Sequence, residues 1–343
     1  MLEKIYVLYM LHLIFQFALT LPLQDVDQNE DLFLMPDLSY LGSSVFKEPN
    51  SESGKLVDTW NETSEINPEE LGEYAEGDIR FPKKGRNGMI AETFRWPNGV
   101  IPYTIEGNFD SDSLKNIERA MDIYHKYTCI KFRGKQSSDD DYIAIVSAST
   151  GCWSSVGRIG GRQEVNLQNP GCTSKVGTPI HELMHAAGFL HEQNRFERDD
   201  FVTIAWQNIK RGHESNFDKA ESSKTTGFGV PYDFRSVMHY SGTAFSVNGK
   251  PTIIPKDSTK TEKMGQREGF SRGDITKLNK MYNCPEKTTA VTGSNNGNTN
   301  SNSNAESNKT DNKNENKENS NPLVNIAQGI IHALFQKTKA QRK

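Results

Sequence analysis

The stretch that decides the fold is residues 181–191, His181-Glu182-Leu183-Met184-His185-Ala186-Ala187-Gly188-Phe189-Leu190-His191. On an α-helix, residues four apart differ by only about 40° in direction, so the imidazoles of His181 and His185 project from one face. Neutral imidazole nitrogens at that spacing can share one Zn²⁺ ion. Glu182 is turned by about 100° from His181, which suits a base that takes a proton from a water on the metal. The spacing therefore predicts a zinc-binding helix.

Gly188 is expected to end this helix, because glycine adopts the left-handed C′ conformation at little cost. The chain can then turn back and bring His191 to the metal as a third ligand. Three neutral ligands beside the carboxylate of Glu182 leave one coordination position open, which is typical of a catalytic zinc site rather than a structural one. Histidines satisfied by ordinary hydrogen bonds would explain any one of these residues, but not the whole pattern.

Residues 236–240, Ser-Val-Met-His-Tyr, form a second candidate element of the site. Met238 is expected to pack against the histidines through its polarizable thioether. The phenol of Tyr240 can approach the metal or stabilise an oxyanion. Alone, this pentapeptide would indicate only a core methionine and a surface tyrosine, but after residues 181–191 it supports the same site.

Composition limits the classes of protein that fit. The chain has 343 residues, 34% hydrophobic and 9% aromatic residues, a formal net charge of −4 and a pI near 6.1. This length accommodates one or two globular domains, and the aromatic content argues against a chain disordered throughout. The weakly acidic balance gives no reason to expect nucleic acid as a partner.

An apolar run at the N-terminus predicts export. Residues 5–19 follow Lys4, and Ala18 and Thr20 supply the small side chains of a signal-peptidase site, so a secretory signal peptide is expected over residues 1–20. The alternative is an uncleaved signal anchor, although the run is short for a membrane span. Removal of the signal predicts a secreted, extracellular protein in an oxidising environment.

Cysteines and glycosylation sequons agree with that environment. Four cysteines form two disulfides in one of three connectivities, and the absence of a C-x-x-C pair disfavours a zinc ribbon. Asn61 and Asn308 each begin an N-x-[ST] sequon, so a glycoprotein is expected. The cysteines are Cys129, Cys152, Cys172 and Cys284.

Composition also divides the rest of the chain. Residues 21–86 are acidic with little periodicity and are interpreted as a loosely structured segment before the main domain. They end in Lys83-Lys84-Gly85-Arg86, a basic cluster of the kind that trypsin-like or furin-like proteases cleave. Residues 87–284 have the composition of a single compact domain. Residues 285–321 form an Asn/Ser/Lys-rich linker that cannot bury enough apolar surface to fold.

The last residues, 322–343, depart from the linker composition. Apolar side chains recur there at helical spacing and basic residues follow, which predicts an amphipathic C-terminal helix. Such a helix can bind a membrane surface or a partner. The alternative that we favour is a terminal helix that docks weakly or frays.

Three strands are predicted inside the main domain. Residues 100–105 predict a strand whose Pro102 favours an edge or an entry position. Residues 142–146 predict a second strand and residues 164–167 a third.

One helix is expected between the first and second of these strands and another after the third. Residues 114–127 predict an amphipathic helix capped by Ser111 or Asp112. The zinc-binding helix is centred on residues 181–189, and few periodic segments follow residue 208. This order suits a mixed α+β domain with a loop-rich second half.

The motif H-E-x-x-H-x-x-G-x-x-H, followed by a methionine turn, is that of the metzincins. Within this clan, His191-Glu192 and Ser236-Val237-Met238-His239-Tyr240 resemble the astacin family of zinc endopeptidases. The resemblance extends across residues 87–284 and includes the stretches at 96–103 and 152–158. It implies an α+β catalytic domain of two lobes separated by a cleft, with the zinc helix at the cleft floor and a loop-rich C-terminal lobe.

The resemblance also implies roles for individual residues. His181, His185 and His191 would bind one Zn²⁺, with Tyr240 as a weak fifth ligand that leaves the metal during turnover. Glu182 would act as general base and then as general acid. The implied disulfide pairs are Cys129–Cys284 and Cys152–Cys172.

Latency is a further implication. Family pro-segments carry F-x-G-D, and Ala75-Glu76-Gly77-Asp78 stands at that place, with Tyr74 beside the missing phenylalanine. Asp78 would bind the zinc in the latent form, and Gly77 would let the backbone approach closely. The alternative interpretation is an ordinary Gly-Asp turn.

Cleavage after Arg86 would release this block and create a new amino group at Asn87. In the family, that ammonium is linked to the glutamate after the third histidine, here Glu192. Because a buried carboxylate without a partner is costly, cleavage is expected to order the C-terminal lobe.

These observations favour a secreted zinc endopeptidase that is made as a zymogen. Residues 21–86 would be its pro-segment. Residues 152–167 resemble the family's edge strand, which pairs with an extended protein or peptide substrate. One alternative is a catalytically silent, zinc-bearing adhesion or regulatory protein, which the intact Glu182 and Tyr240 disfavour. Another is a metal hydrolase acting on other bonds, which the edge strand disfavours.

Overall fold

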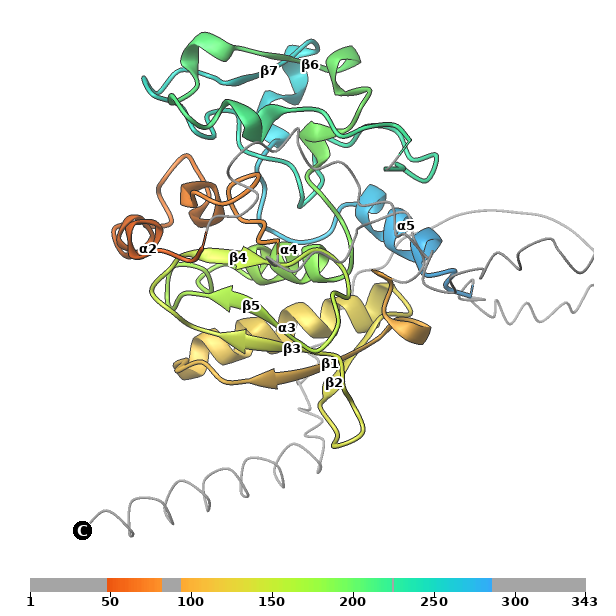
Figure 1. The fold of residues 1–343 in the computed structure, drawn as a ribbon. Coiled ribbons are helices and arrows are strands. Elements are labelled where there is room, and N and C mark those ends of the chain that lie inside the picture. The colour runs from red at the N-terminus through yellow and green to blue at the C-terminus, as the bar shows by residue number, and fades with distance from the viewer. Residues whose placement is uncertain (1–47, 82–93, 224, 286–343) are drawn as a thin grey trace, which may run out of the picture. The chain divides into compact units, whose positions relative to one another are not determined.

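The computed structural model describes residues 48–81, 94–223 and 225–285 (Figure 1). The predicted signal peptide, the cleavage site at Arg86 and Asn87, the second sequon, the linker and the C-terminal helix lie outside these residues. Among the helices described, none combines the length and the apolar composition needed to cross a membrane.

A five-stranded sheet forms the N-terminal lobe. Its strand order is β2-β1-β3-β5-β4, in which β4 runs antiparallel to β5 and the other neighbours are parallel. All three predicted strands are confirmed, whereas β2 and β4 are too short to show a periodic pattern. The strands are β1 (Val100–Ile105), β2 (Lys131–Gly134), β3 (Tyr142–Val146), β4 (Cys152–Ser154) and β5 (Arg162–Leu167).

The edge position considered for Pro102 is wrong, because β1 lies between β2 and β3. Pro102 pairs with Arg133 of β2, and pairing with β3 begins only at Tyr103. The proline therefore occupies the entry part of the strand, where the missing N–H interrupts no ladder with β3.

Helix α3 (Ser111–Tyr127) packs against α4 (Gly177–Ala186), which also contacts β4 and β5 (Figure 1). The N-cap of α3 is Asp110, whose carboxylate accepts two backbone N–H groups of the first turn, so the caps predicted at Ser111 or Asp112 are wrong. The apolar stripe of α3 is buried as its period predicts. Its buried apolar side chains are Ile117, Ala120, Met121 and Tyr124.

The C-terminal lobe is rich in loops, as predicted. It pairs β6 (Val202–Ile204) with β7 (Ile253–Pro255) and has its own apolar core around Phe217. Helix α5 (Arg272–Met281), which the sequence pattern does not predict, packs through Leu278 into the apolar core of the N-terminal lobe, called the first core below. Two lobes with separate cores agree with the predicted α+β class. The 3-10 helices are Pro68–Leu71, Pro97–Gly99, Glu192–Asn194, Arg198–Asp200, Trp206–Asn208, Glu214–Phe217 and Ser258–Lys263.

Two disulfides link Cys129 to Cys284 and Cys152 to Cys172, which are the pairs that the resemblance implies. The first joins cysteines 155 positions apart and fastens the chain after α5 to the connection between α3 and β2. The second fastens β4 to the segment that leads into α4.

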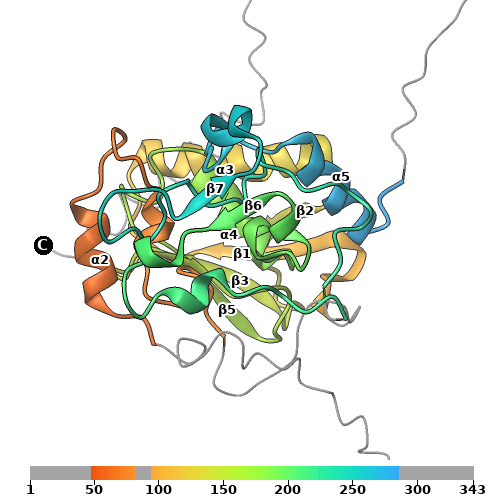
Figure 2. The same ribbon diagram turned by 90° about the horizontal axis from the view of Figure 1, so that it is seen from above.

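Residues 48–81, called the upstream segment below, are folded and not loosely structured as expected. They contain α2 (Ser51–Asp58), which lies at the opposite end of the domain from α5 (Figure 2). Tyr74 and Ile79 are each only 1% exposed. Contacts with the main domain hold this segment in place, and a periodic pattern within the segment could not have revealed them.

Candidate active site

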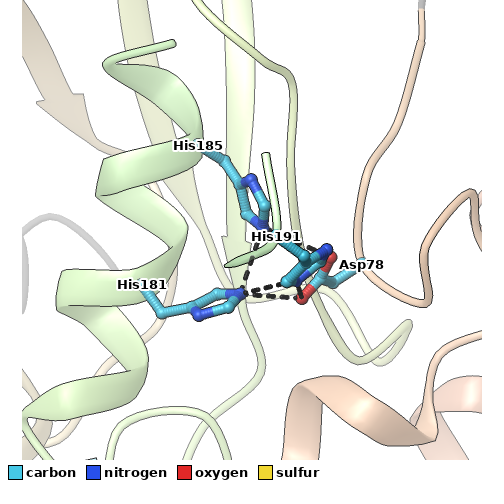
Figure 3. A group of neighbouring side chains, drawn as sticks. All are labelled: Asp78, His181, His185 and His191. Atoms are coloured by element: carbon cyan, nitrogen blue, oxygen red, sulfur yellow. Dashed lines mark hydrogen bonds and ion pairs between the residues drawn. The ribbon is translucent and has the colours of Figure 1, made fainter. Parts of the chain in front are cut away.

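Helix α4 directs His181 and His185 to one side, and the chain then returns to bring His191 beside them (Figure 3). The Nε2 atom of His181 lies 3.1 Å from Nε2 of His185 and 3.2 Å from Nε2 of His191. Gly188, with φ of 111°, makes the turn that permits this return. These three buried histidines are called the histidine cluster below.

The other ring nitrogen of each histidine faces an oxygen acceptor. In chain order, the three Nδ1 atoms lie 2.8 Å from the carbonyl oxygen of Val237, 2.7 Å from that of Phe189 and 2.7 Å from a carboxylate oxygen of Glu76. Since these oxygens accept and do not donate, each Nδ1 carries the proton and each Nε2 presents a lone pair. Three lone pairs therefore converge on one point.

The geometry of this point fits zinc. Ligands in a tetrahedron of bonds about 2.0–2.1 Å long stand about 3.3 Å apart, close to the 3.1 and 3.2 Å measured within the cluster. Asp78 supplies a fourth donor, with Oδ2 at 3.0 Å from Nε2 of His181 and Oδ1 at 3.3 Å from Nε2 of His185. Nitrogen and carboxylate donors in this arrangement are those that Zn²⁺ prefers.

The pKa values of two central carboxyl groups are displaced in opposite directions. Burial by itself raises the pKa of Asp78, but its electrostatic and hydrogen-bonding interactions with the histidine cluster outweigh burial and hold the pKa well below its usual range. Burial, followed by the charge of Asp78, raises the pKa of Glu182 well above its usual range. A buried carboxyl group with a raised pKa beside a cluster of metal-ligand type is a candidate for proton transfer, which fits Glu182.

The carboxylate of Glu182 is also unsatisfied in its hydrogen bonding. Both of its carboxylate oxygens are buried and have no hydrogen-bond partner within the described part of the chain. Leaving a buried carboxylate unsatisfied is costly, so such a group needs an explanation in function. A water held beside the histidine cluster would provide its partner.

The methionine turn, residues 236–240, is hydrogen-bonded to the residue after the third histidine, and Tyr240 lies against the cluster. Met238 is buried in the first core, and its carbonyl oxygen accepts the backbone N–H of Glu192 at 3.0 Å. The ring of Tyr240 lies 4.6 Å from that of His191, centroid to centroid, and its hydroxyl donates to the carbonyl oxygen of Glu76. Burial and nearby carboxylates raise the pKa of Tyr240 well above its usual range, so the phenol is a neutral donor.

Glu192 has partners although the chain is uncut, so the premise of an unpaired carboxylate before cleavage is wrong. The Nζ atom of Lys277 lies 2.6 Å from one carboxylate oxygen, and Nη1 of Arg195 lies 2.9 Å from the other. Burial raises the pKa of Glu192, but these two cations lower it overall. No motif marks Lys277, which lies 85 residues from Glu192 in sequence.

The upstream segment binds the rim of the sheet. Ile79 forms a parallel bridge with Ser154, whose N–H donates to the Asp78 carbonyl oxygen and whose carbonyl oxygen accepts the N–H of Arg80, both at 2.9 Å. Of the two strands within residues 152–167, β4 lies at an edge of the sheet and β5 is an inner strand, which corrects the expectation of one edge strand over that whole range.

The same segment inserts two glutamates into the domain. Glu69 pairs with Arg267, and both side chains are 1% exposed. Glu70 accepts hydrogen bonds from the backbone and the hydroxyl of Ser241 at 2.7 and 2.6 Å. Sequence reasoning missed all four residues, because the contacts join positions far apart and follow no local pattern.

Fold and site together define a zinc peptidase of the metzincin type. The defining features are a helix with two histidines, a third histidine after a glycine turn, a buried glutamate and a methionine turn.

Comparison with known proteins places the chain within this class. Residues 88–283, more than half of the chain, match the family model "Astacin", which describes a family of peptidases. Zinc metalloproteinase nas-4 of Caenorhabditis elegans is 39% identical over 283 residues, which are 80% of this chain and 81% of that protein. This chain belongs to the astacin family of zinc metalloproteinases.

Other relatives match mainly over the catalytic domain. Meprin A subunit beta of Rattus norvegicus is 43% identical over 218 residues, which are 63% of this chain and 30% of that protein. High choriolytic enzyme 1, a hatching enzyme zinc-protease from Oryzias latipes, is 40% identical, with a TM-score of 0.53 over 58% of this chain and 100% of that chain. The chain thus spans most of nas-4 and less than a third of the meprin subunit.

Proposed function

We propose that this protein is a secreted zinc endopeptidase, made as a zymogen that the upstream segment keeps latent. The observation that carries the proposal is the convergence of three Nε2 lone pairs beside Glu182, the buried and orphaned carboxylate. Export is supported by the N-terminal apolar run and by the two disulfides.

The site residues divide the chemistry of peptide hydrolysis between them. When bound, zinc would polarise the scissile carbonyl group and lower the pKa of the attacking water. Glu182 would accept a proton from that water and deliver it to the leaving amine. Tyr240 would donate its hydroxyl to the developing oxyanion once the carbonyl group of Glu76 is withdrawn. An extended protein substrate would pair with the edge of β4.

Latency would follow from occupation of the same positions. Asp78 would take the remaining place on the zinc, and the bridge between Ile79 and Ser154 would cover the strand edge that a substrate needs. A trypsin-like or furin-like protease would cut after Arg86. Sequencing of the active form should then find Asn87 at its N-terminus, and a start many residues away would contradict this boundary.

Glu182→Gln tests the proposed catalytic role. The processed variant should keep one zinc per chain and lose about 10²- to 10⁴-fold in kcat on a fluorogenic peptide, the usual contribution of a general base. Glu118→Gln, which changes an exposed glutamate of α3, is the matched control and should keep its activity. A Glu182→Gln enzyme with zinc and undiminished turnover would contradict the mechanism.

A second assay separates this function from a silent zinc-bearing protein. Processed wild-type protein should digest casein, and a zinc chelator should stop the digestion. Zinc-loaded protein that leaves casein and peptide libraries intact would support the adhesion or regulatory alternative.

A further inference from the structure

A buried group of charges lies directly after the third histidine. The side chains of Glu192 and Lys277 are 3% and 5% exposed, and Lys277 Nζ also lies 3.5 Å from the carboxylate of Asp274. Arg195, with a side chain 13% exposed, pairs with the other oxygen of Glu192. Arg195 also pairs with Glu197, so in this part of the described domain two cations are shared among three carboxylates.

Glu192 connects the segments that build the site. Its carboxylate accepts the backbone N–H of Asp233 at 2.9 Å, and its own N–H donates to the carbonyl oxygen of Met238 at 3.0 Å. The residue after His191 is therefore tied to residues 233–238 through both its side chain and its backbone. Loss of a cation that pairs with Glu192 would therefore displace the neighbouring third histidine, His191.

Helix α5 holds both sides of this connection. Asp274 accepts the hydroxyl of Ser236 at 2.6 Å and the N–H of Val237 at 2.9 Å, one turn before Lys277 reaches Glu192. The Val237 carbonyl oxygen is in turn the acceptor for His181. One turn of α5 therefore supports two of the three histidines through their neighbours.

We propose that Lys277 is a positioning residue of the zinc site. Its ammonium group supplies the counter-charge for Glu192, so that His191 and the methionine turn have their working arrangement before cleavage. This inference rests on the proposed zinc-peptidase function, and it replaces the expectation that a new amino group at Asn87 orders the site. Departure of the upstream segment, and not a new ion pair, then activates the enzyme.

Zinc retention tests this role without reference to activity. In the processed enzyme, Lys277→Met leaves Glu192 with Arg195 as its remaining cation, and zinc transfer to a competing chelator should be at least about 10-fold faster than in wild type. Lys280→Met removes an exposed ammonium group from the same helix and should change the rate by less than about 2-fold. An unchanged rate in Lys277→Met would overturn the proposal.

A double variant separates charge from packing. Adding Glu192→Gln to Lys277→Met removes the unbalanced carboxylate, so zinc retention should recover most of what the single variant lost. If the loss came from packing alone, the double variant would be no better than Lys277→Met, and the counter-charge role would be wrong.

A third experiment concerns the new N-terminus. Two residues inserted after Arg86 should leave kcat/KM of the processed enzyme within about 2-fold of wild type, as for a neutral surface change. A loss of about 100-fold, the effect of an unpaired buried charge, would show that the amino group at Asn87 is required and would refute the inference. If every processed form, wild type included, lacks chelator-sensitive activity, the proposed function fails, whereas zinc-transfer rates still decide the role of Lys277.

Discussion

Removal of the Asp78 carboxylate should activate the enzyme without cleavage. Asp78 is 1% exposed, and its oxygens lie 3.0 to 3.3 Å from the Nε2 atoms of the histidine cluster. Asp78→Ala, made together with Arg86→Ala to keep the chain intact, should therefore weaken docking of the upstream segment at the site. The expected signal is peptidase activity in a chain that mass spectrometry shows to be uncut.

The size of the effect follows from the burial of Asp78 against the histidine cluster. Removing one partner of a buried ion pair costs about 3–5 kcal/mol, and each 1.36 kcal/mol is tenfold. The population of chains with an open site should thus rise by roughly 10²- to 5 × 10³-fold. Glu69 with Arg267, and Ile79 with Ser154, still hold the segment, so activity should remain below that of the processed enzyme.

The assay is hydrolysis of a fluorogenic peptide by intact protein at fixed zinc content. Glu52→Ala in the same uncleavable chain is the control, since Glu52 lies on the exposed side of α2 with Lys55 as its partner. If the intact Asp78→Ala chain binds zinc and stays as inactive as the intact parent, Asp78 does not impose latency.

The other expected outcomes concern stability and the metal. Gly188→Ala places a Cβ atom at positive φ and 2.7 Å from Met281 Cε, so unfolding in urea should show a loss of about 1–3 kcal/mol. Replacing Cys129 and Cys284 by serine opens a loop of 155 residues and should cost about 5 kcal/mol in the same measurement, and a change below about 1 kcal/mol would contradict the chain-entropy account. Asp110→Ala removes the cap of α3 and should cost about 1 kcal/mol with kcat unchanged. Dialysis against a chelator should abolish activity, and added Zn²⁺ should restore it; activity that survives complete metal removal would exclude a metallopeptidase.

The zinc helix could be predicted from sequence because its information is local. The spacing of His181 and His185 sets their common direction through the pitch of the helix alone. The end of the helix at Gly188 is also a local property, because a residue without a Cβ atom adopts positive φ at little cost. Strands β1 and β3 are runs of six and five mostly apolar, β-branched or aromatic residues, which are long enough to indicate a strand, whereas β2 and β4, with four and three residues, are not.

The family resemblance predicted the roles of individual residues and the pairing of the cysteines, such as Cys129 with Cys284. Composition alone allowed three disulfide connectivities. It could not show how this chain satisfies its own buried charges. The departure at Ala75 was visible in sequence, but the contacts of Tyr74 with Thr150 and Trp153 were not.

Tertiary structure alone decided the long-range ion pairs. Glu69 meets Arg267 across 198 residues, and Glu192 meets Lys277 across 85. Nothing in the local sequence distinguishes these charged residues from others, and charged side chains are usually expected to be exposed to solvent. Folding brings the partners together and removes them from water, and only then does each charge acquire a required partner.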